Sequence, residues 1–347
     1  MDWLRIGARE KERGTTARMR TPMVLIGLAA ASIAMFALNL LAGTSDLADG
    51  KLHDTFLALR TTRGLVAYLA GSALAVAGVI AQGLFRNPLA SPDVLGTTAG
   101  ASFVGKLSLL LLQATLTGGA VHHVLPELLL PLGCLLGALL SLLVLLAVAR
   151  RADDAVVLLL SGFLLSALFL SLGSFVTSLA QESWELGRAV IAFALGSVTG
   201  AGSRQVAIIA PITIAGTLAA MLWSRPLDLL LSGEDEARVL GLDVTRTRRW
   251  CIAWTALLTA GAVAVGGNLG FVGLVVPHGL RRLVGVSHRK LVPAAALGGG
   301  VFVLACDVLA RSLPSRTEVP LGVITGITGA PLFLWLLLRS RRSLLHG

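Results

Sequence analysis

Long apolar runs without charge alternate along the chain with short polar segments that hold most of its charged residues. Because the hydrocarbon core of a bilayer is about 30 Å thick, a helix that crosses it needs about 20 consecutive apolar residues. We predict ten crossings, at residues 22–43, 64–85, 94–112, 128–149, 155–180, 205–223, 250–265, 269–276, 291–310 and 320–338. Residues 189–202 are apolar, short and end in glycine, which predicts a re-entrant half-helix. The pattern therefore predicts an all-α polytopic membrane protein.

The distribution of charge predicts how these helices are oriented. Lys and Arg concentrate in the two terminal tails and in alternate loops, and the positive-inside rule places those segments in the cytoplasm. We therefore predict one transmembrane domain over residues 22–340, flanked by cytoplasmic tails at residues 1–21 and 341–347. The formal net charge of +10 follows this topology, so nucleic acid is not an expected partner.

Composition excludes a soluble domain, since 55% of the 347 residues are hydrophobic and only 14% are charged. Cys134, Cys251 and Cys306 lie in apolar segments without the spacing of a metal site, and we interpret them as small packing residues. The sequence contains no zinc-protease motif, no P-loop and no serine-hydrolase motif. We therefore expect neither catalysis nor a bound metal or cofactor on this chain.

The segment 266–282 has four glycines before a proline and an arginine pair, at the end of an uncharged run. In lipid every backbone polar group needs an internal partner, so glycine-dense or broken helices survive only where protein or a cavity protects them. We therefore expect this segment to pack its backbone tightly inside the protein and to lead into a cytoplasmic loop.

The polar segment 225–249 carries the signals of a short surface helix. Ser232 begins a predicted capping box, Glu234 and Arg238 are spaced as an i,i+4 ion pair, and Gly241 predicts the end of the helix. Such a helix on the cytoplasmic side offers a contact for a soluble partner.

A second helix-start signal follows the predicted crossing at 64–85. Ser91 is expected as the N-cap and Pro92 as the first helical residue, with Asp93 in the first turn, where the helix dipole favours an anion.

Ionisable residues well inside the predicted crossings are few, namely Lys106 and Asp307. A stand-alone ion-coupled carrier or channel usually shows a relay of buried carboxylates or histidines, and one aspartate makes a poor relay. We therefore expect the energy for any transport to come from another chain. A purely structural membrane anchor would leave Arg60 and Arg63 unexplained, a pair that the charge distribution places on the external side. His278 and His288 fall on the predicted cytoplasmic side, and we interpret them as structural or partner-facing residues rather than metal ligands.

A set of motifs spreads in order over about residues 55–340. It comprises Arg60-Thr61-Thr62-Arg63, residues 71–78, Gln82, residues 87–92, Leu95-Gly96, residues 233–241, residues 270–278, Gly285 with His288-Arg289, Asp307 with Arg311, residues 318–322 and residues 329–333. Together these motifs resemble the FecCD-type permeases of ABC importers for iron–siderophore complexes, haem and cobalamin. One departure is Thr62, where the family usually has proline; it affects the helix-start turn rather than the charges.

The resemblance implies a cobalamin-permease-like type II ABC importer fold in the bacterial inner membrane. It implies a homodimer with two cytoplasmic ATPase subunits below it and a periplasmic binding protein above it, and a path for substrate between the two permease copies. ATP and Mg²⁺ would bind to the ATPase, so this chain is not an enzyme by itself. The expected cargo is an iron complex, either haem or a ferric siderophore, with cobalamin as the alternative.

Arginines at the external mouth of the family's permeases receive acidic residues of the binding protein, and the matching residues are Arg60, Arg63 and Arg311. Arg60 and Arg63 lie three residues apart, on one face of a helix, and interface charges of this kind steer docking. The alternative is that they are solvated side chains. For Arg311 a second alternative is an ion pair with Asp307, four residues earlier.

The remaining site residues also follow from the resemblance. The residues matching the family's ATPase-coupling helix are Gly233, Glu234, Glu236, Ala237, Arg238, Leu240 and Gly241, and those matching its cytoplasmic gate are Asn87, Pro88 and Leu89. The residues matching its structural motifs are Gly270, Phe271, Gly273, Pro277, His278, Asp307, Glu318, Pro320 and Gly322. An ordinary amphipathic loop helix and a plain helix-ending turn are the alternatives for the first two groups.

Overall fold

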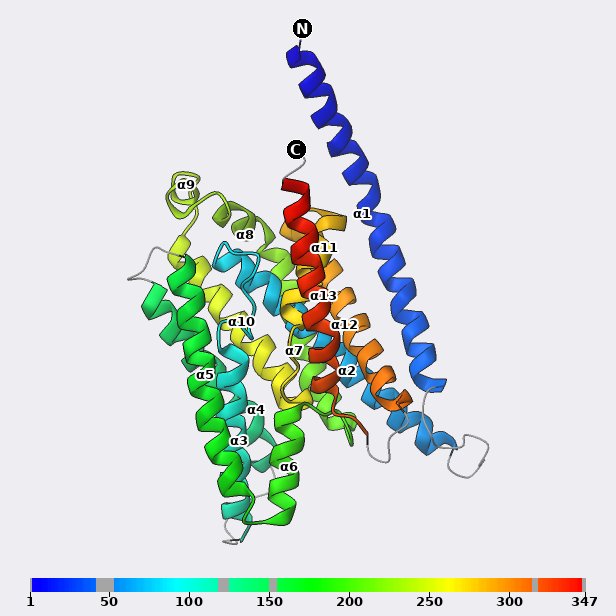
Figure 1. Ribbon diagram of the computed structural model, residues 1–347, viewed down its shortest axis with the longest axis vertical. Helices are drawn as coiled ribbons and strands as arrows, with labels where there is room; N and C mark the ends of the chain where they lie inside the picture. Colours follow the sequence, from blue (N-terminus) through cyan, green and yellow to red (C-terminus); the bar gives the residue numbers. More distant parts are fainter. Residues whose placement is uncertain (1, 42–52, 118–124, 150–154, 314–317, 345–347) are drawn as a thin grey trace.

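The computed structural model describes residues 2–41, 53–117, 125–149, 155–313 and 318–344. In these segments the chain forms thirteen helices (Figure 1). They are α1 (Asp2–Leu41), α2 (His53–Leu84), α3 (Thr97–Thr117), α4 (Leu125–Ala149), α5 (Ala155–Ala180), α6 (Trp184–Leu195), α7 (Ser203–Leu222), α8 (Ser224–Leu230), α9 (Glu234–Val239), α10 (Val244–Gly266), α11 (Val272–Val284), α12 (His288–Ser312) and α13 (Leu321–Leu344).

Eight of these helices are long and apolar enough to cross a membrane, namely α1 from Thr21 onward, α2, α4, α5, α7, α10, α12 and α13. The chain is therefore a multi-pass membrane protein, as its hydrophobic pattern predicts. The other two predicted crossings correspond to α3 and to α11, which has 13 residues. At 1.5 Å per residue α11 is about 20 Å long, shorter than the hydrocarbon core of a bilayer. For the described part of the chain the structure thus supports eight full-length crossings, and the count of ten stays a prediction.

Helix α2 lies at the centre of the bundle and is buried over most of its length, packed against α7, α10, α11 and α12. Helices α3, α4, α5 and α6 pack together beside it, and α10 contacts members of both groups. Figure 1 shows α1 and α12 on the opposite side of the bundle from α3 to α6. Both ends of the chain lie at the end of the bundle that carries α8 and α9.

Helices α2 and α11 touch through glycine. A Cβ atom added to Gly78 would overlap the carbonyl oxygen of Gly273, so the two backbones lie in direct contact. Small residues allow this close approach in membrane proteins. Residues 272–277 of α11 are all buried. The structure therefore confirms tight backbone packing inside the protein for the part of the segment 266–282 around Gly273.

The predicted bounds of the crossing at 269–276 are wrong. Helix α11 begins at Val272, after Phe271 has taken a left-handed conformation with φ of +67°, and continues to Val284 through Pro277. Proline has no N–H to donate to the carbonyl of Gly273, four residues earlier. That carbonyl accepts from Gln82 Nε2 of α2 instead, at 3.4 Å. The neighbouring helix therefore supplies the hydrogen bond that the proline removes, and the helix continues.

The predicted start of the crossing at 94–112 is also wrong. Residues 91–95 form one turn in which Ser91 Oγ accepts from Val94 N at 3.3 Å, as an N-cap would. Gly96 then takes a φ of +78°, which interrupts the helical conformation, and α3 begins only at Thr97. Asp93 does not sit in the first turn of α3. Its Oδ2 accepts from Phe271 N at 2.9 Å, at the start of α11.

Two further boundaries differ from the prediction. Helix α1 is continuous from Asp2 to Leu41, so the predicted tail 1–21 and the first crossing form one helix. Helix α6 begins at Trp184, five residues before the predicted half-helix, and ends at Gly196, which has a φ of +74°. Its 12 residues give a length of about 18 Å, less than a full crossing.

Candidate functional site

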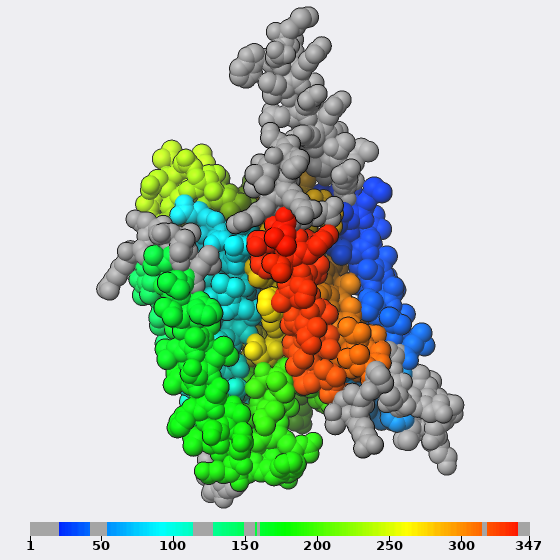
Figure 2. Space-filling view, viewed as in Figure 1, coloured from blue at the N-terminus to red at the C-terminus, as the bar shows by residue number. Residues whose placement is uncertain are grey.

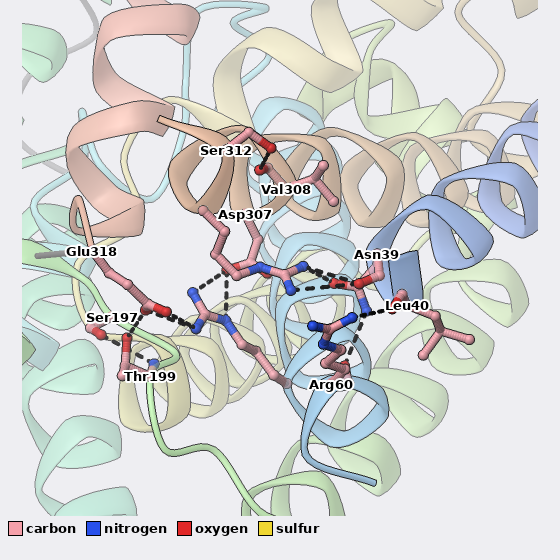
Figure 3. A network of polar contacts seen from close by, with 11 residues as sticks. Asn39, Leu40, Arg60, Ser197, Thr199, Asp307, Val308, Ser312 and Glu318 are labelled. Atoms are coloured by element: carbon pink, nitrogen blue, oxygen red, sulfur yellow. Dashed lines mark hydrogen bonds and ion pairs between the residues drawn. The ribbon is translucent and has the colours of Figure 1, made fainter. Parts of the chain in front are cut away.

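An ion network joins α2, α12 and the segment before α13 at the end of the bundle opposite α9 (Figures 1 and 3). Its centre is Arg63 of α2. Arg63 Nη2 lies 2.9 Å from Asp307 Oδ1 of α12, and Arg63 Nη1 lies 2.8 Å from Glu318 Oε2. Thr199 Oγ1, in the loop after α6, donates to the same Glu318 oxygen at 2.9 Å. One guanidinium thus ties together segments that are far apart in the sequence.

The network extends to the end of α1 through the other two predicted docking arginines. Arg311 Nε lies 3.2 Å from Asp307 Oδ2, and Arg311 also bonds to the side chain of Asn39. Arg60 Nη1 donates to the carbonyl oxygen of Leu40 at 2.6 Å, while Asn39 Nδ2 donates to the Arg60 carbonyl at 3.0 Å. The ion pair between Arg311 and Asp307, which the sequence left open as an alternative, is present.

These charges differ widely in exposure. The side chains of Arg63, Arg311 and Asp307 are 14%, 6% and 0% exposed, whereas that of Glu318 is 45% exposed. The structure therefore brings Arg60, Arg63 and Arg311 together, but holds them against partners within the chain rather than in open solvent. Partial burial raises the pKa of Glu318, but the hydrogen bond and charge of Arg63 outweigh it and hold that pKa below its ordinary value. Glu318 is thus the accessible member of the network.

The opposite end of the bundle carries the short helix α9, and here the predicted capping box is wrong. Gly233, not Ser232, is the N-cap, with a φ of +125° and no side-chain hydrogen bond. Glycine adopts such a φ without a steric penalty, whereas serine would be strained there. The predicted end is confirmed: Gly241 has a φ of +83°, and Leu242 N bonds back to Ala237 O at 2.9 Å.

Helix α9 presents charges and apolar side chains to solvent. The predicted pair forms, with Arg238 Nη2 3.7 Å from Glu234 Oε2, and Arg238 also lies 3.3 Å from Asp235 Oδ1. Glu234 makes a second ion pair with Arg248 of α10. Val239 and Leu240 are 87% and 62% exposed, while Ala237 is buried against the protein beneath. The region of α9 therefore leaves both apolar and charged side chains open to contact from another protein.

A pair that the sequence did not reveal connects this region to the core. His288 Nδ1, at the start of α12, lies 2.6 Å from Asp228 Oδ1 of α8, and His288 N donates to the same oxygen at 2.9 Å. The His288 side chain is fully buried. Partial burial raises the pKa of Asp228, but its hydrogen bonds from His288 hold that pKa below its ordinary value. The pair fixes α8, the helix that leads to α9, against α12.

The predicted gate residues form a compact turn between α2 and residues 91–95. Asn87 Oδ1 accepts from Leu89 N at 2.9 Å, and Ala90 N bonds to the Asn87 carbonyl at 3.0 Å. Arg86 has a φ of +49°, which reverses the chain after α2. The asparagine thus stabilises the turn locally, as Asx turns do, while Pro88 is exposed and Leu89 is partly buried.

The predicted structural-motif residues lie where backbone segments meet. Gly322 N, in the first turn of α13 after Pro320, donates to Gly196 O at 3.2 Å, and a Cβ at Gly322 would overlap the carbonyl oxygens of Asn268 and Leu195. The His278 ring meets Phe333 of α13 edge-on, with centroids 5.7 Å apart. A Cβ atom added to Gly270, by contrast, would meet no atom of the described residues within 4 Å, so close packing does not explain that glycine.

A cavity of about 310 Å³ lies beside the break between α10 and α11. Its wall includes Asp93, Thr98 and Ala99, then Asn268, Gly270, Phe271 and Leu274 around the break, and Phe163, Ser166 and Leu170 of α5. Figure 2 shows a hollow between α5 (green) and α13 (red), with yellow residues in its floor. The sequence did not predict this cavity, because its walls come from segments that only the fold brings together.

Helix α5 exposes both apolar side chains and serines on its surface next to this cavity. Leu164, Leu168 and Phe175 form an apolar face, as expected for contact with lipid. Ser171, Ser174 and Ser178 are also exposed, and their spacing places them on one face of the helix. Ser171 Oγ and Ser174 Oγ donate to the carbonyls of Ala167 and Leu170, so these hydroxyls are satisfied within the helix and are compatible with lipid or with contact to another protein.

This architecture is that of a membrane transport subunit: a multi-pass helical bundle with a cavity between its helices and a short charged helix at one end. Comparison with known proteins establishes its family. Residues 20–339 match the FecCD transport family, and the chain belongs to that family. Its relatives are permease proteins of ABC importers, in which the ATPase is a separate protein, so the chain is a permease subunit rather than an enzyme.

Three curated relatives share about a third of their residues with this chain. The Fe(3+) dicitrate transport system permease protein FecD of Escherichia coli is 37% identical, over 83% of this chain and 87% of its own length. The hemin transport system permease protein HmuU of Yersinia pestis is 33% identical, over 92% of this chain and 94% of its own length. The cobalamin import system permease protein BtuC of Halobacterium salinarum is 36% identical, over 80% of this chain and 72% of its own length.

The fold also matches a solved structure described as an inward-facing conformation of a putative metal-chelate type ABC transporter. The TM-score is 0.77 at 29% sequence identity, covering 91% of this chain and 99% of that chain. Family membership thus agrees in sequence and in fold over nearly the whole length. It also places the chain in the cytoplasmic membrane as a multi-pass importer permease.

Proposed function

We propose that this chain carries an iron complex, either haem or a ferric siderophore, across the cytoplasmic membrane into the cell. The observation that carries the proposal is the fold shared over 91% of the chain with a transporter described as metal-chelate type. Two of the three relatives above handle ferric dicitrate and hemin, which supports iron as the cargo. Cobalamin import by the same mechanism is the second candidate, favoured by the 36% identity to a cobalamin permease.

In this proposal two copies of the chain form a homodimer and the cargo passes between them. The cavity beside the α10–α11 break and the exposed serines of α5 would line that path, because the cavity wall includes Phe163, Ser166 and Leu170 of the same helix. The turn Asn87-Pro88-Leu89 would close the cytoplasmic side of the path, as the family resemblance implies.

Helix α9 of each permease copy would dock one ATPase subunit. The two ATPase subunits would bind the ATP and Mg²⁺. The exposed Val239 and Leu240 would supply apolar contact, and the charged residues would fix the orientation of the docked ATPase. Asp228 and His288 would transmit the motion, because they tie α8 to α12 with short hydrogen bonds. Both termini lie at the α9 end of the bundle and are therefore cytoplasmic in this proposal.

The opposite end would receive the periplasmic binding protein. Arg63 and Arg311 are not freely solvated, so docking requires an exchange of partners: an acidic residue of the binding protein would replace the exposed Glu318 at Arg63. Arg60, whose guanidinium bonds to the end of α1, would shape the docking surface by fixing that helix. An exchange of this kind makes docking reversible, since Glu318 can return.

Ligand binding by the cognate binding protein tests the cargo. We expect tight binding of haem or of one ferric siderophore in a panel of haem, several ferric siderophores and cyanocobalamin. Tight binding of cyanocobalamin with no binding of any iron complex would instead establish the second candidate. A matched control is the same panel without iron, because a transporter of the complex should discriminate against the metal-free siderophore.

A further inference from the structure

Lys106 of α3 places a positive charge between helices. The residue is 7% exposed, and its Nζ donates to the carbonyl oxygen of Gly173 on α5 at 3.3 Å. Gly173 leaves room for it, since a Cβ there would lie 3.3 Å from Nζ. Thr177 Oγ1 donates to the same carbonyl at 2.8 Å, so the ammonium shares its acceptor.

The described residues supply no carboxylate for this ammonium. The acidic groups inside the bundle are already engaged, Asp93 with the N–H of Phe271 and Asp307 with Arg63 and Arg311. A charged group at membrane depth is costly unless it has a partner, and such groups mark the paths of substrates and ions. The packing of α3 against α5 therefore does not account for the charge, because an uncharged side chain of the same length would fill the space.

The ammonium lies close to both surfaces proposed to line the path. On α3 it is seven residues beyond Ala99, which lines the cavity, and this spacing puts both on one face about 10 Å apart along the axis. Ser171 and Ser174 are exposed on other sides of α5, so the body of this helix separates them from the ammonium at Gly173. One helix diameter is again about 10 Å. At this depth little water is present to screen the charge.

We propose that Lys106 makes the path electropositive and so selects anionic cargo, such as haem with its propionates or ferric dicitrate, over neutral chelates. This inference rests on the proposed function and narrows its substrate class. The ammonium acts through space rather than by direct contact, because it is buried between the two helices. At about 10 Å and an effective dielectric constant of about 20, one charge favours a monoanion roughly tenfold, and more for a dianion.

The test compares Lys106→Met, which keeps the stem and removes the charge, with Lys106→Arg, which keeps the charge. Each variant is reconstituted in proteoliposomes with its ATPase and binding protein. The uptake probes are haem and ferric dicitrate as anions, and ferrichrome and cyanocobalamin as neutral complexes. We expect Lys106→Met to reduce uptake of the anionic probes at least tenfold relative to any neutral probe that is delivered, and Lys106→Arg to retain it. Thermal stability of Lys106→Met should not fall, because the substitution removes a costly charge.

The outcomes separate this inference from the function on which it rests. Equal loss of anionic and neutral uptake together with lower thermal stability would show that Lys106 only supports packing, and would overturn the inference. So would unchanged uptake of the anions in Lys106→Met, or delivery of neutral probes alone by the wild type. Absence of ATP-dependent uptake of every probe by the wild type would overturn the proposed function itself.

Discussion

The two ends of the bundle use the same kinds of charged residue in opposite ways. At the end with Arg63, the carboxylate of Asp307 is fully buried between two guanidiniums, and five segments of the chain meet there. At the α9 end, Arg238 is 60% exposed and its partners Glu234 and Asp235 lie on the same short helix. The first cluster holds the fold together, whereas the second belongs to a surface.

The difference matters because sequence patterns alone make the two clusters look alike. Both contain arginines near acidic residues in segments that the family resemblance assigns to partner docking. Breaking a buried ion pair strands an unpaired charge and costs about 3–5 kcal/mol, while an exposed i,i+4 pair contributes about 0.3–0.5 kcal/mol. A substitution at the Arg63 end should therefore act first on the stability of the fold. A substitution at the α9 end should act first on the coupling of ATP hydrolysis to transport.

The largest effect is expected for Asp307→Asn. The substitution removes the negative charge between Arg63 and Arg311. The free energy of unfolding should fall by nearly as much as when a buried ion pair is broken, about 3–5 kcal/mol. Thermal unfolding of the purified protein in detergent measures it. Glu318→Gln is the matched control, since Glu318 is 45% exposed and should cost far less. Equal unfolding temperatures for Asp307→Asn and the wild type would show that the network does not hold these segments together.

Arg238→Glu should have the next largest effect, on transport rather than on folding. Reversing this charge on α9 should lower ATPase activity stimulated by the binding protein several-fold, while the unfolding temperature changes little, because the pair is exposed. Arg188→Glu, an equal charge change on the exposed surface of α6, is the control at the opposite end. Normal stimulated activity in Arg238→Glu would remove α9 from the coupling surface.

Glu318→Gln should strengthen docking of the binding protein modestly. In the proposed exchange Glu318 competes with an incoming carboxylate for Arg63, so its removal should raise affinity by about two- to fivefold, most clearly at low salt. Surface-immobilised transporter titrated with binding protein at two ionic strengths measures the change. Weaker docking of Glu318→Gln would mean that the glutamate itself contacts the partner, and the exchange would be wrong.

The smallest effect concerns pH. Because the pKa of Glu318 is held below its ordinary value in the folded protein, its contribution to stability is present above about pH 4.3 and is lost as the pH falls through its lowered folded value. The unfolding temperatures of the wild type and Glu318→Gln should therefore converge in acid. A difference that grows as the pH falls would contradict the assigned direction.

Sequence reasoning recovered the membrane class, the family and the short helix α9, because these depend on hydrophobic period, local pairs and motifs. It failed where a distant segment decides the local conformation. Helix α11 continues through Pro277, and Gln82 of α2 donates to the Gly273 carbonyl that the proline leaves without its helical partner. Likewise, the aspartate expected to favour the start of α3 lies instead at the start of α11. The pairing of Arg63 with Glu318, 255 residues later, carries no local signal at all.

The most direct test of the account is ATP-dependent uptake by the complete assembly. The purified permease is placed in proteoliposomes with its ATPase, with ATP enclosed and the binding protein outside, and uptake of the iron complex selected by that binding protein is followed. The account predicts uptake that requires both the ATPase and hydrolysable ATP, and no ATP hydrolysis by the permease alone. Uptake driven by a proton or sodium gradient, in liposomes without the ATPase, would contradict it.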